Sequence, residues 1–299
     1  MSDQYSLSSF AGAYDVYGPS YGFPLVFLHA DALTRKMWQP QIDALSTAFR
    51  VVVLDLPGHG ALGRYTFRLS TAVEEVAHIM AEEVKSQALL VGLSLGGFVA
   101  IALAHEHPEL LAGLVLSGCS LDTQGMNETL LKLKGTLLSK SAAPLERLVS
   151  GVTEKALRRL YPAQAENPLL NAGAYWKGAG EAWQECAGKD FRAMLHTYQG
   201  PVLVLNGEND GNSRKSEEAL LSSASHENIR VQTLANAGHM CNIDQPRAFN
   251  NALRGFTQAD MYHSYHYGYQ GNKEADERQQ YYVEFEAPPL PPMEDIPEE

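Results

Sequence analysis

The sequence is poor in cysteine. Three cysteines occur among 299 residues, and their wide spacing leaves no Cys-x-x-Cys pair and no Cys/His ligand cluster. This pattern excludes a disulfide framework and is typical of reduced thiols in the cytoplasm. We therefore expect a cytoplasmic location and neither a bound metal nor a cofactor.

Basic residues are also scarce. Lysine and arginine total 23 against 35 aspartates and glutamates, which gives a formal net charge of −12. No basic cluster is present, so the chain lacks the charge pattern of a nucleic-acid-binding protein. No apolar run reaches the roughly 18 residues that a bilayer crossing needs. Residues 1–5 lack a basic segment followed by an apolar one, so we expect neither a membrane span nor a signal peptide.

The chain does contain apolar runs that alternate with helical patterns. Strands are expected at 14–17, 24–28, 50–54, 88–91, 114–116, 201–205 and 229–234, and helices at 36–48, 70–85, 97–104, 216–223 and 246–256. Unbroken apolar strands between helices indicate a sheet that is covered on both faces. The predicted fold class is α/β, with a mostly parallel central sheet and helices on both sides.

The alternation lapses between residues 122 and 196, where helical segments such as 130–138, 145–161 and 171–186 occur without a strand. We predict a core made of residues 1–121 and 197–257, interrupted by a helical cap over residues 122–196. Residues 258–299 are acidic and proline-rich, and we expect them to be mostly disordered. Such a tail is either a solvated end or a binding segment for a protein partner.

The most informative motif is Gly-Leu-Ser-Leu-Gly at residues 92–96. It follows the apolar run 88–91 and precedes an apolar helical segment. In that context a G-x-S-x-G serine sits on a sharp strand-to-helix turn and serves as a nucleophile. Glycine keeps bulky side chains away from the turn, and the following helix places free N–H groups near Ser94.

A serine hydroxyl needs a base to accept its proton and an acid to orient that base. His239 follows the last expected strand in Ala-Gly-His, and Asp210 follows the preceding one in Gly-Glu-Asn-Asp. Loops at the carboxyl edge of a parallel sheet gather catalytic groups. We predict Ser94, Asp210 and His239 as a catalytic triad, with Asp122 as a second candidate for the acid.

The chain order serine, aspartate, histidine resembles that of the α/β-hydrolase fold. The motifs at 28–30, 55–60, 92–97, 207–210 and 238–239 are similar to those of its small capped esterases, lactonases and carbon–carbon hydrolases. The resemblance covers residues 10–257. It implies an oxyanion hole formed by the backbone N–H groups of Leu95 and Asp31.

One motif departs from the family pattern. Ala30 stands where the family usually has glycine, and Asp31 occupies the position of an oxyanion donor. A carboxylate directed into the hole would repel the oxyanion. The Asp31 side chain is therefore expected to point outward, or to bond a substrate or cap residue, and the departure suggests an unusual substrate preference.

Several other side chains are candidates for supporting roles. Tyr175, Trp176 and Trp183 belong to the predicted cap and could line an apolar substrate site, although helix packing explains them equally well. His29 and His59 lie in loops that, in the resembled family, form the floor of the site. We expect these two histidines to be structural.

The predicted function is that of a serine hydrolase. It would cleave an ester, lactone or related small-molecule carbonyl substrate through an acyl-enzyme on Ser94. Carbon–carbon hydrolysis and perhydrolysis use the same triad without a cofactor and are alternatives within the fold. A non-catalytic ligand receptor or scaffold is the alternative from another class, and the tail and the Ala30-Asp31 departure motivate it.

Overall fold

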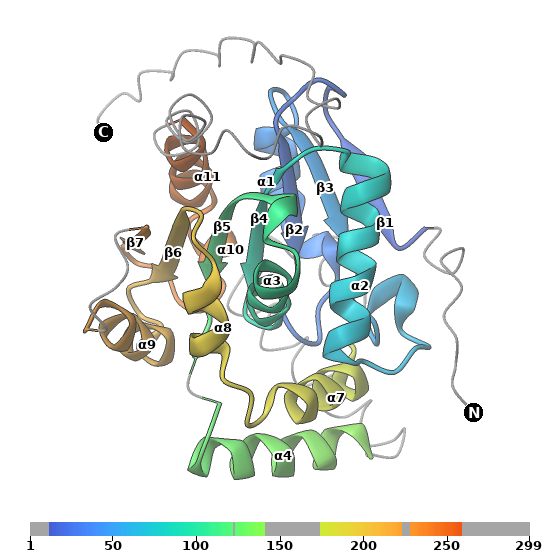
Figure 1. Cartoon of the computed structure of the whole chain (residues 1–299), viewed down its shortest axis with the longest axis vertical. Helices are drawn as coiled ribbons and strands as arrows, with labels where there is room; N and C mark the ends of the chain where they lie inside the picture. Colours follow the sequence, from blue (N-terminus) through green and yellow to red (C-terminus); the bar gives the residue numbers. More distant parts are fainter. Residues whose placement is uncertain (1–11, 122, 141–173, 223–227, 259–299) are drawn as a thin grey trace, which may run out of the picture.

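The computed structural model describes residues 12–121, 123–140, 174–222 and 228–258. Its centre is a seven-stranded sheet of order β1-β3-β2-β4-β5-β6-β7 (Figure 1). The strands are β1 (Tyr14–Tyr17), β2 (Pro24–Leu28), β3 (Arg50–Leu54), β4 (Ala88–Leu93), β5 (Leu111–Ser117), β6 (Val202–Gly207) and β7 (Ile229–Leu234). All neighbouring pairs are parallel except β1 with β3. The predicted α/β class with a mostly parallel sheet is confirmed.

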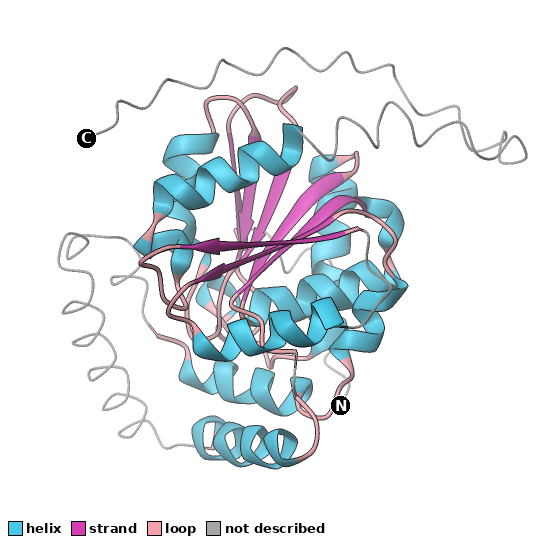
Figure 2. Ribbon diagram, turned by 90° about the vertical axis from the view of Figure 1, so that its left-hand side faces the viewer, coloured by secondary structure: helices cyan, strands magenta, loops and turns pink. Residues whose placement is uncertain are grey.

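Helices cover both faces of this sheet (Figure 2). They are α1 (Gln39–Leu45), α2 (Leu69–Ile79), α3 (Leu95–Glu106), α4 (Met126–Ser139), α7 (Trp176–Cys186), α8 (Phe191–Thr197), α9 (Gly211–Ser222), α10 (Cys241–Asp244) and α11 (Pro246–Phe256). In the described part of the chain, no helix combines the length and apolar character that a membrane crossing requires.

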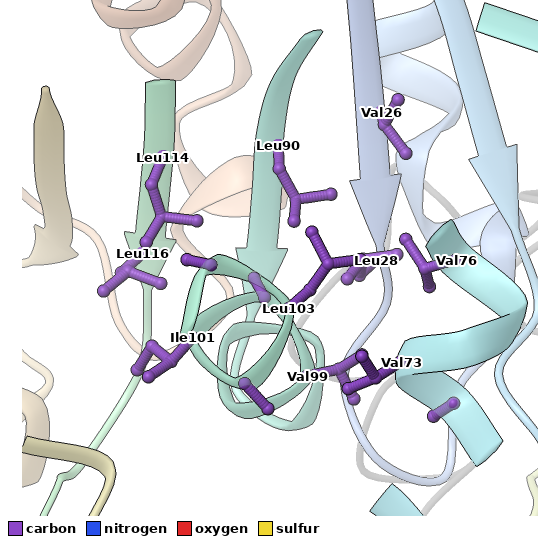
Figure 3. Close-up of a cluster of buried hydrophobic side chains, with 14 of the residues drawn as sticks. Val26, Leu28, Val73, Val76, Leu90, Val99, Ile101, Leu103, Leu114 and Leu116 are labelled. Atoms are coloured by element: carbon purple, nitrogen blue, oxygen red, sulfur yellow. The ribbon is translucent and has the colours of Figure 1, made fainter. Parts of the chain in front are cut away.

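Successive side chains of a strand point to opposite faces of the sheet. Because helices cover both faces, the central strands are buried on both sides. Val26 and Leu28 of β2 belong to the cluster that packs against α2 and α3, which Figure 3 shows. Leu25 and Phe27 belong to the cluster on the other face, under α1 and α11. This two-sided burial explains why the strands are unbroken apolar runs in the sequence.

The helix expected at 36–48 is wrong in its bounds. A 3₁₀ turn spans Arg35–Trp38, and α1 begins at Gln39 with Pro40 in its first turn. Proline lacks the N–H that a helix interior uses, but its fixed φ suits the start of a helix. The expected helix 70–85 ends differently as well, because Met80–Val84 is a π-helical turn that Lys85 closes at φ 58°.

Helices α4 and α7 lie beyond the carboxyl ends of the parallel strands (Figure 1). Helix α7 is attached to the core at its start, where Ala32 and Tyr175 form an antiparallel bridge and the Tyr175 N–H donates to the Ala32 carbonyl. It is attached again at Glu181, which accepts a hydrogen bond from the Phe67 N–H at 2.9 Å. Two points of attachment fix the direction of α7 relative to the sheet.

Glycine allows α7 to approach the core closely. A Cβ on Gly178 would lie 2.2 Å from the carbonyl oxygen of Gly58, whose own φ is +79°. Helix α8 packs on α3 through the rings of Phe191 and Phe98, whose centroids are 4.6 Å apart. The predicted helix 145–161 and residues 259–299 of the predicted tail lie outside the described residues. The division into core, cap and tail stays a prediction.

Candidate active site

Ser94 lies at the turn between β4 and α3. Its φ is +54° and its ψ is −112°, a backbone conformation that non-glycine residues rarely adopt. A Cβ on Gly92 would lie 2.4 Å from the Gly96 carbonyl oxygen, and one on Gly96 would lie 2.2 Å from that of Leu28. The glycines of the motif are therefore required by close backbone contacts, and such strain is typical of functional sites.

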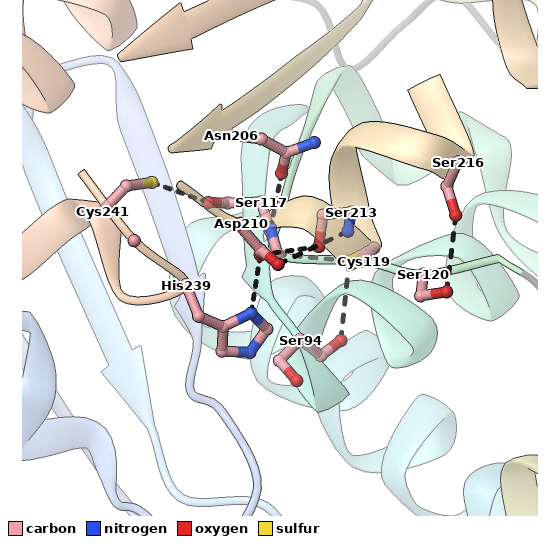
Figure 4. Close-up of polar contacts among 12 residues, drawn as sticks. Ser94, Ser117, Cys119, Ser120, Asn206, Asp210, Ser213, Ser216, His239 and Cys241 are labelled. Carbon is pink, nitrogen blue, oxygen red and sulfur yellow. Dashed lines mark hydrogen bonds and ion pairs between the residues drawn. The ribbon is translucent and has the colours of Figure 1, made fainter. Parts of the chain in front are cut away.

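His239 and Asp210 form a hydrogen-bonded pair (Figure 4). The imidazole Nδ1 lies 2.7 Å from Asp210 Oδ2, and the Ser213 hydroxyl donates to the same oxygen at 2.7 Å. Burial raises the pKa of Asp210, but the hydrogen bonds from His239 and Ser213 outweigh it and lower the pKa to about 2. Asp210 is therefore a stable anion that holds a proton on Nδ1 and leaves Nε2 free to accept one.

The imidazole of His239 lies between Asp210 and Ser94 in Figure 4. The hydrogen bond to Asp210 raises the pKa of His239 against the lowering effect of burial, and the charges of Asp210 and Asp31 raise it further. Gly118, at φ +61°, leaves room for the ring, since a Cβ there would lie 2.9 Å from the imidazole Cε1. A larger residue at 118 would displace the His239 ring.

The hydroxyl of Ser94 donates a hydrogen bond to Oδ1 of Asp31 at 3.4 Å. No hydrogen bond joins Ser94 to His239 among the described residues, although the two side chains are neighbours. Nucleophile–base hydrogen bonds are often loose without substrate.

The second oxygen of Asp31, Oδ2, accepts a hydrogen bond from Trp183 Nε1 at 2.8 Å. The expected contact of Asp31 with the cap region is therefore present. Its carboxylate nevertheless does not point away from the nucleophile, because the Trp183 indole holds it beside Ser94. Repulsion of an oxyanion favours the expected outward orientation, but the hydrogen bond from the Trp183 indole outweighs it in this structure.

The N–H groups of Leu95 and Asp31 donate no hydrogen bond within the described part of the chain. Leu95 is the first residue of α3, where backbone N–H groups have no partner in the helix. The loop that carries Asp31 is held by His59, whose Nε2 accepts from the Ala32 N–H at 3.2 Å. Both amides are therefore without a protein partner among the described residues, as the predicted oxyanion hole requires, and their role in it stays a prediction.

His29 and His59 are fully buried and neutral. Each ring has a carbonyl partner at Nδ1, Ala30 for His29 and Pro57 for His59. Burial lowers the pKa of His29 to about 4 and that of His59 to about 3. Both rings therefore support loops of the site without carrying charge.

The predicted aromatic residues occupy different places. Trp183 reaches Asp31, whereas the Tyr175 ring lies against Gly63 and 6.2 Å from the His59 ring. Trp176 has a buried Nε1 that finds no hydrogen-bond partner among the described residues. Asp122, the second candidate acid, lies outside the described residues. Among the described residues, no three histidines, cysteines, aspartates or glutamates are grouped to hold a metal.

Sequence reasoning missed two supporting residues. Ser213 follows Asp210 by three positions at the start of α9, a spacing typical of helix capping, and this signal could have identified it. Gly118 has no comparable signal, because its role depends on where the imidazole lies in space.

The profile of a family described as "Alpha/beta hydrolase family" matches residues 25–252. The chain belongs to the alpha/beta hydrolase family. The pimeloyl-(acyl-carrier protein) methyl ester esterase of Yersinia enterocolitica is 38% identical over 259 residues, which is 78% of this chain and 93% of the relative. The enzyme of the same name from Vibrio vulnificus is also 38% identical, over 79% of this chain and 94% of its own.

Solved structures agree with this assignment. A hydrolase from Pseudomonas aeruginosa PA01 has a TM-score of 0.69 and 26% identity, and the match covers 82% of this chain and 94% of the other. A thermophilic esterase from Thermogutta terrifontis shares the fold, with 23% identity and a TM-score of 0.68. That match covers 82% of this chain and 92% of the other. The predictions of the alpha/beta hydrolase family and of a hydrolase enzyme are confirmed.

Proposed function

We propose that this alpha/beta hydrolase cleaves methyl and other short alkyl esters through an acyl-enzyme on Ser94. The observation that carries the proposal is the juxtaposition of a strained serine at the start of α3 with the His239–Asp210 pair. The relatives named above are methyl ester esterases, which supports a small alcohol as the leaving group.

The reaction uses each group of the site in turn. His239 Nε2 takes the hydroxyl proton while Ser94 Oγ bonds to the substrate's carbonyl carbon. The N–H groups of Leu95 and Asp31 donate hydrogen bonds to the carbonyl oxygen and stabilise the negative charge that forms on it. The imidazolium then gives its proton to the departing alcohol. Throughout this step, the Asp210 anion stabilises the imidazolium and keeps the ring oriented.

Water completes the cycle. His239 removes a proton from a water molecule, which attacks the acyl-enzyme and releases the carboxylic acid. Ser94 recovers its proton from the imidazolium when its bond to the acyl group breaks. We also propose a cytoplasmic location, which the three buried cysteines support because each is a free thiol.

The test is active-site labelling followed by turnover. Wild-type protein is treated with a fluorophosphonate and its intact mass is measured beside Ser94→Ala, His239→Ala and the exposed control Ser86→Ala. One adduct is expected on the wild type and on the control, and none on the other two variants. Hydrolysis of methyl butanoate is expected to follow the same order. A folded wild type that takes no adduct and cleaves no ester would contradict the proposal.

A further inference from the structure

The carboxylate of Asp31 lies at the nucleophile and is held there from two sides. Oδ1 is 3.4 Å from Ser94 Oγ, and Oδ2 accepts the Trp183 indole N–H at 2.8 Å. The backbone N–H of the same residue belongs to the oxyanion hole predicted above. An anion is thus fixed where the reaction itself creates negative charge.

No positive side chain compensates this anion in the described part of the chain. Asp31 forms no ion pair with a lysine or an arginine there. His59 is buried and neutral, with a pKa of about 3. His239 must be neutral when it accepts the proton of Ser94. The free enzyme therefore presents an uncompensated negative charge to the substrate.

We propose that Asp31 is a specificity-determining residue that selects esters with an ammonium or other cationic group close to the scissile carbonyl and rejects those with an anionic group there. This inference rests on the proposed ester hydrolysis. A cationic substrate supplies the charge that the site lacks, whereas a second anion adds to the repulsion.

The geometry assigns this role to Oδ1. Trp183 already occupies Oδ2. Among the described residues, Oδ1 has only the Ser94 hydroxyl as a partner, at the long end of the hydrogen-bond range. The carbonyl carbon of the substrate bonds to Ser94 Oγ, so its immediate substituents lie next to Oδ1. Hydrogen bonds and ion pairs to a carboxylate are stronger than neutral contacts, which makes the selection measurable.

The experiment compares kcat/KM for matched ester pairs. Butanoylcholine is paired with 3,3-dimethylbutyl butanoate for the alcohol side, and methyl 2-aminohexanoate with methyl hexanoate for the acyl side. The wild type is expected to prefer the cation by about tenfold or more in at least one pair. Monomethyl succinate is expected to react more slowly than methyl butanoate.

Asp31→Asn keeps the size of the side chain and the backbone N–H but removes the charge. The cationic preference is expected to fall to about threefold or less in this variant. Asp31→Ala is a second neutral variant for the case that the first is inactive. Asp43→Asn is the matched control, since Asp43 is exposed on α1, where its carboxylate accepts a hydrogen bond from Gln39. It is expected to keep the wild-type ratio.

Two results would overturn the inference while leaving the proposed function intact: equal rates for both members of each pair in the wild type, or a cationic preference that survives both neutral variants. A wild type that cleaves none of the esters and takes no fluorophosphonate on Ser94 would instead refute ester hydrolysis itself, and the inference with it.

Discussion

The buried histidines beneath the site make the fold sensitive to acid. His29 and His59 have pKa values of about 4 and about 3 in the folded protein, compared with 6.5 for a solvated histidine. The unfolded chain therefore binds their protons first as pH falls. Their contribution to stability is complete above pH 6.5 and is lost progressively as pH falls toward those lower values.

The magnitude follows from one pKa unit being about 1.4 kcal/mol. As pH falls from 6.5 through its folded pKa, the stability contributed by neutral His29 decreases by about 3 kcal/mol and that contributed by His59 by about 5 kcal/mol. The sum is comparable to the ~5–15 kcal/mol stability of a typical protein. Between pH 4.5 and 5.5, each ring contributes close to one proton taken up on unfolding. Each therefore adds about 1.4 kcal/mol per pH unit to the slope of unfolding free energy against pH.

Glu75 acts in the opposite direction. Burial raises its pKa well above 4.5, and the charge of Asp55 adds to this effect. Its contribution to stability is present below pH 4.5 and is lost as pH rises through its folded pKa. As pH falls, the contribution of Glu75 to stability thus grows while that of the two histidines shrinks. The wild-type slope of unfolding free energy against pH is the difference between these two effects.

Denaturant unfolding at several pH values between 4.5 and 5.5 separates these groups. His59→Gln is expected to lower the slope by about 1.4 kcal/mol per pH unit, and Glu75→Gln to raise it by a similar amount. His105→Gln is a control on the exposed end of α3 and is expected to leave the slope unchanged. An unchanged slope in His59→Gln, and likewise in His29→Gln, would refute the reasoning.

Three further predictions concern the turn, the cap contact and the base. Gly96→Ala is expected to cost about 3 kcal/mol or more and to abolish turnover, because its Cβ would lie 2.2 Å from a carbonyl oxygen. Gly255→Ala is the control: nothing lies within 4 Å of its Cβ, and its free energy of unfolding should rise by about 0.5–1 kcal/mol. Chemical denaturation and turnover assays check both variants, and equal stabilities of the two would contradict the prediction. Trp183→Phe should lower kcat for neutral esters about tenfold, because it releases the Asp31 carboxylate. The same substitution should lower kcat less in an Asp31→Asn background. Additive losses in this double-mutant cycle would exclude a coupling between Trp183 and Asp31. The acidic limb of the pH profile of kcat/KM should lie above pH 6.5, because the Asp210 hydrogen bond raises the pKa of His239. In Asp31→Asn this limb should move to lower pH, because the charge of Asp31 also raises that pKa. A limb that stays in place would contradict the effect of the Asp31 charge on His239.

Much of the fold was predictable because its physical causes are local. Strands buried on both faces must be apolar throughout, so runs such as 24–28 and 202–205 are recognisable without neighbours. The bounds of α1 were not predicted, because Pro40 suits a helix start as well as it breaks a helix interior. Helix α8 was also not anticipated, since its burial depends on the Phe98 ring of a distant helix.

The site was predictable to the extent that chain order encodes it. The positions of Ser94, Asp210 and His239 after three strands of one sheet are sufficient to place them at one edge. The orientation of Asp31 depends on a hydrogen bond between residues 152 positions apart, which sequence spacing does not reveal. Side-chain direction in a loop is decided by such distant partners, whereas the location of a loop is decided by the sheet.

The bridge between Ala32 and Tyr175 has a consequence for protein engineering. It joins the start of α7 to the loop next to Ser94, and the Gly58–Gly178 contact leaves no space for even a methyl group between them. A chimera that exchanges specificity elements with another hydrolase should therefore retain residues 174–186 with the parent sheet and join the foreign segment before residue 174. Junctions placed after α7 would import a helix whose glycines and backbone partners no longer match.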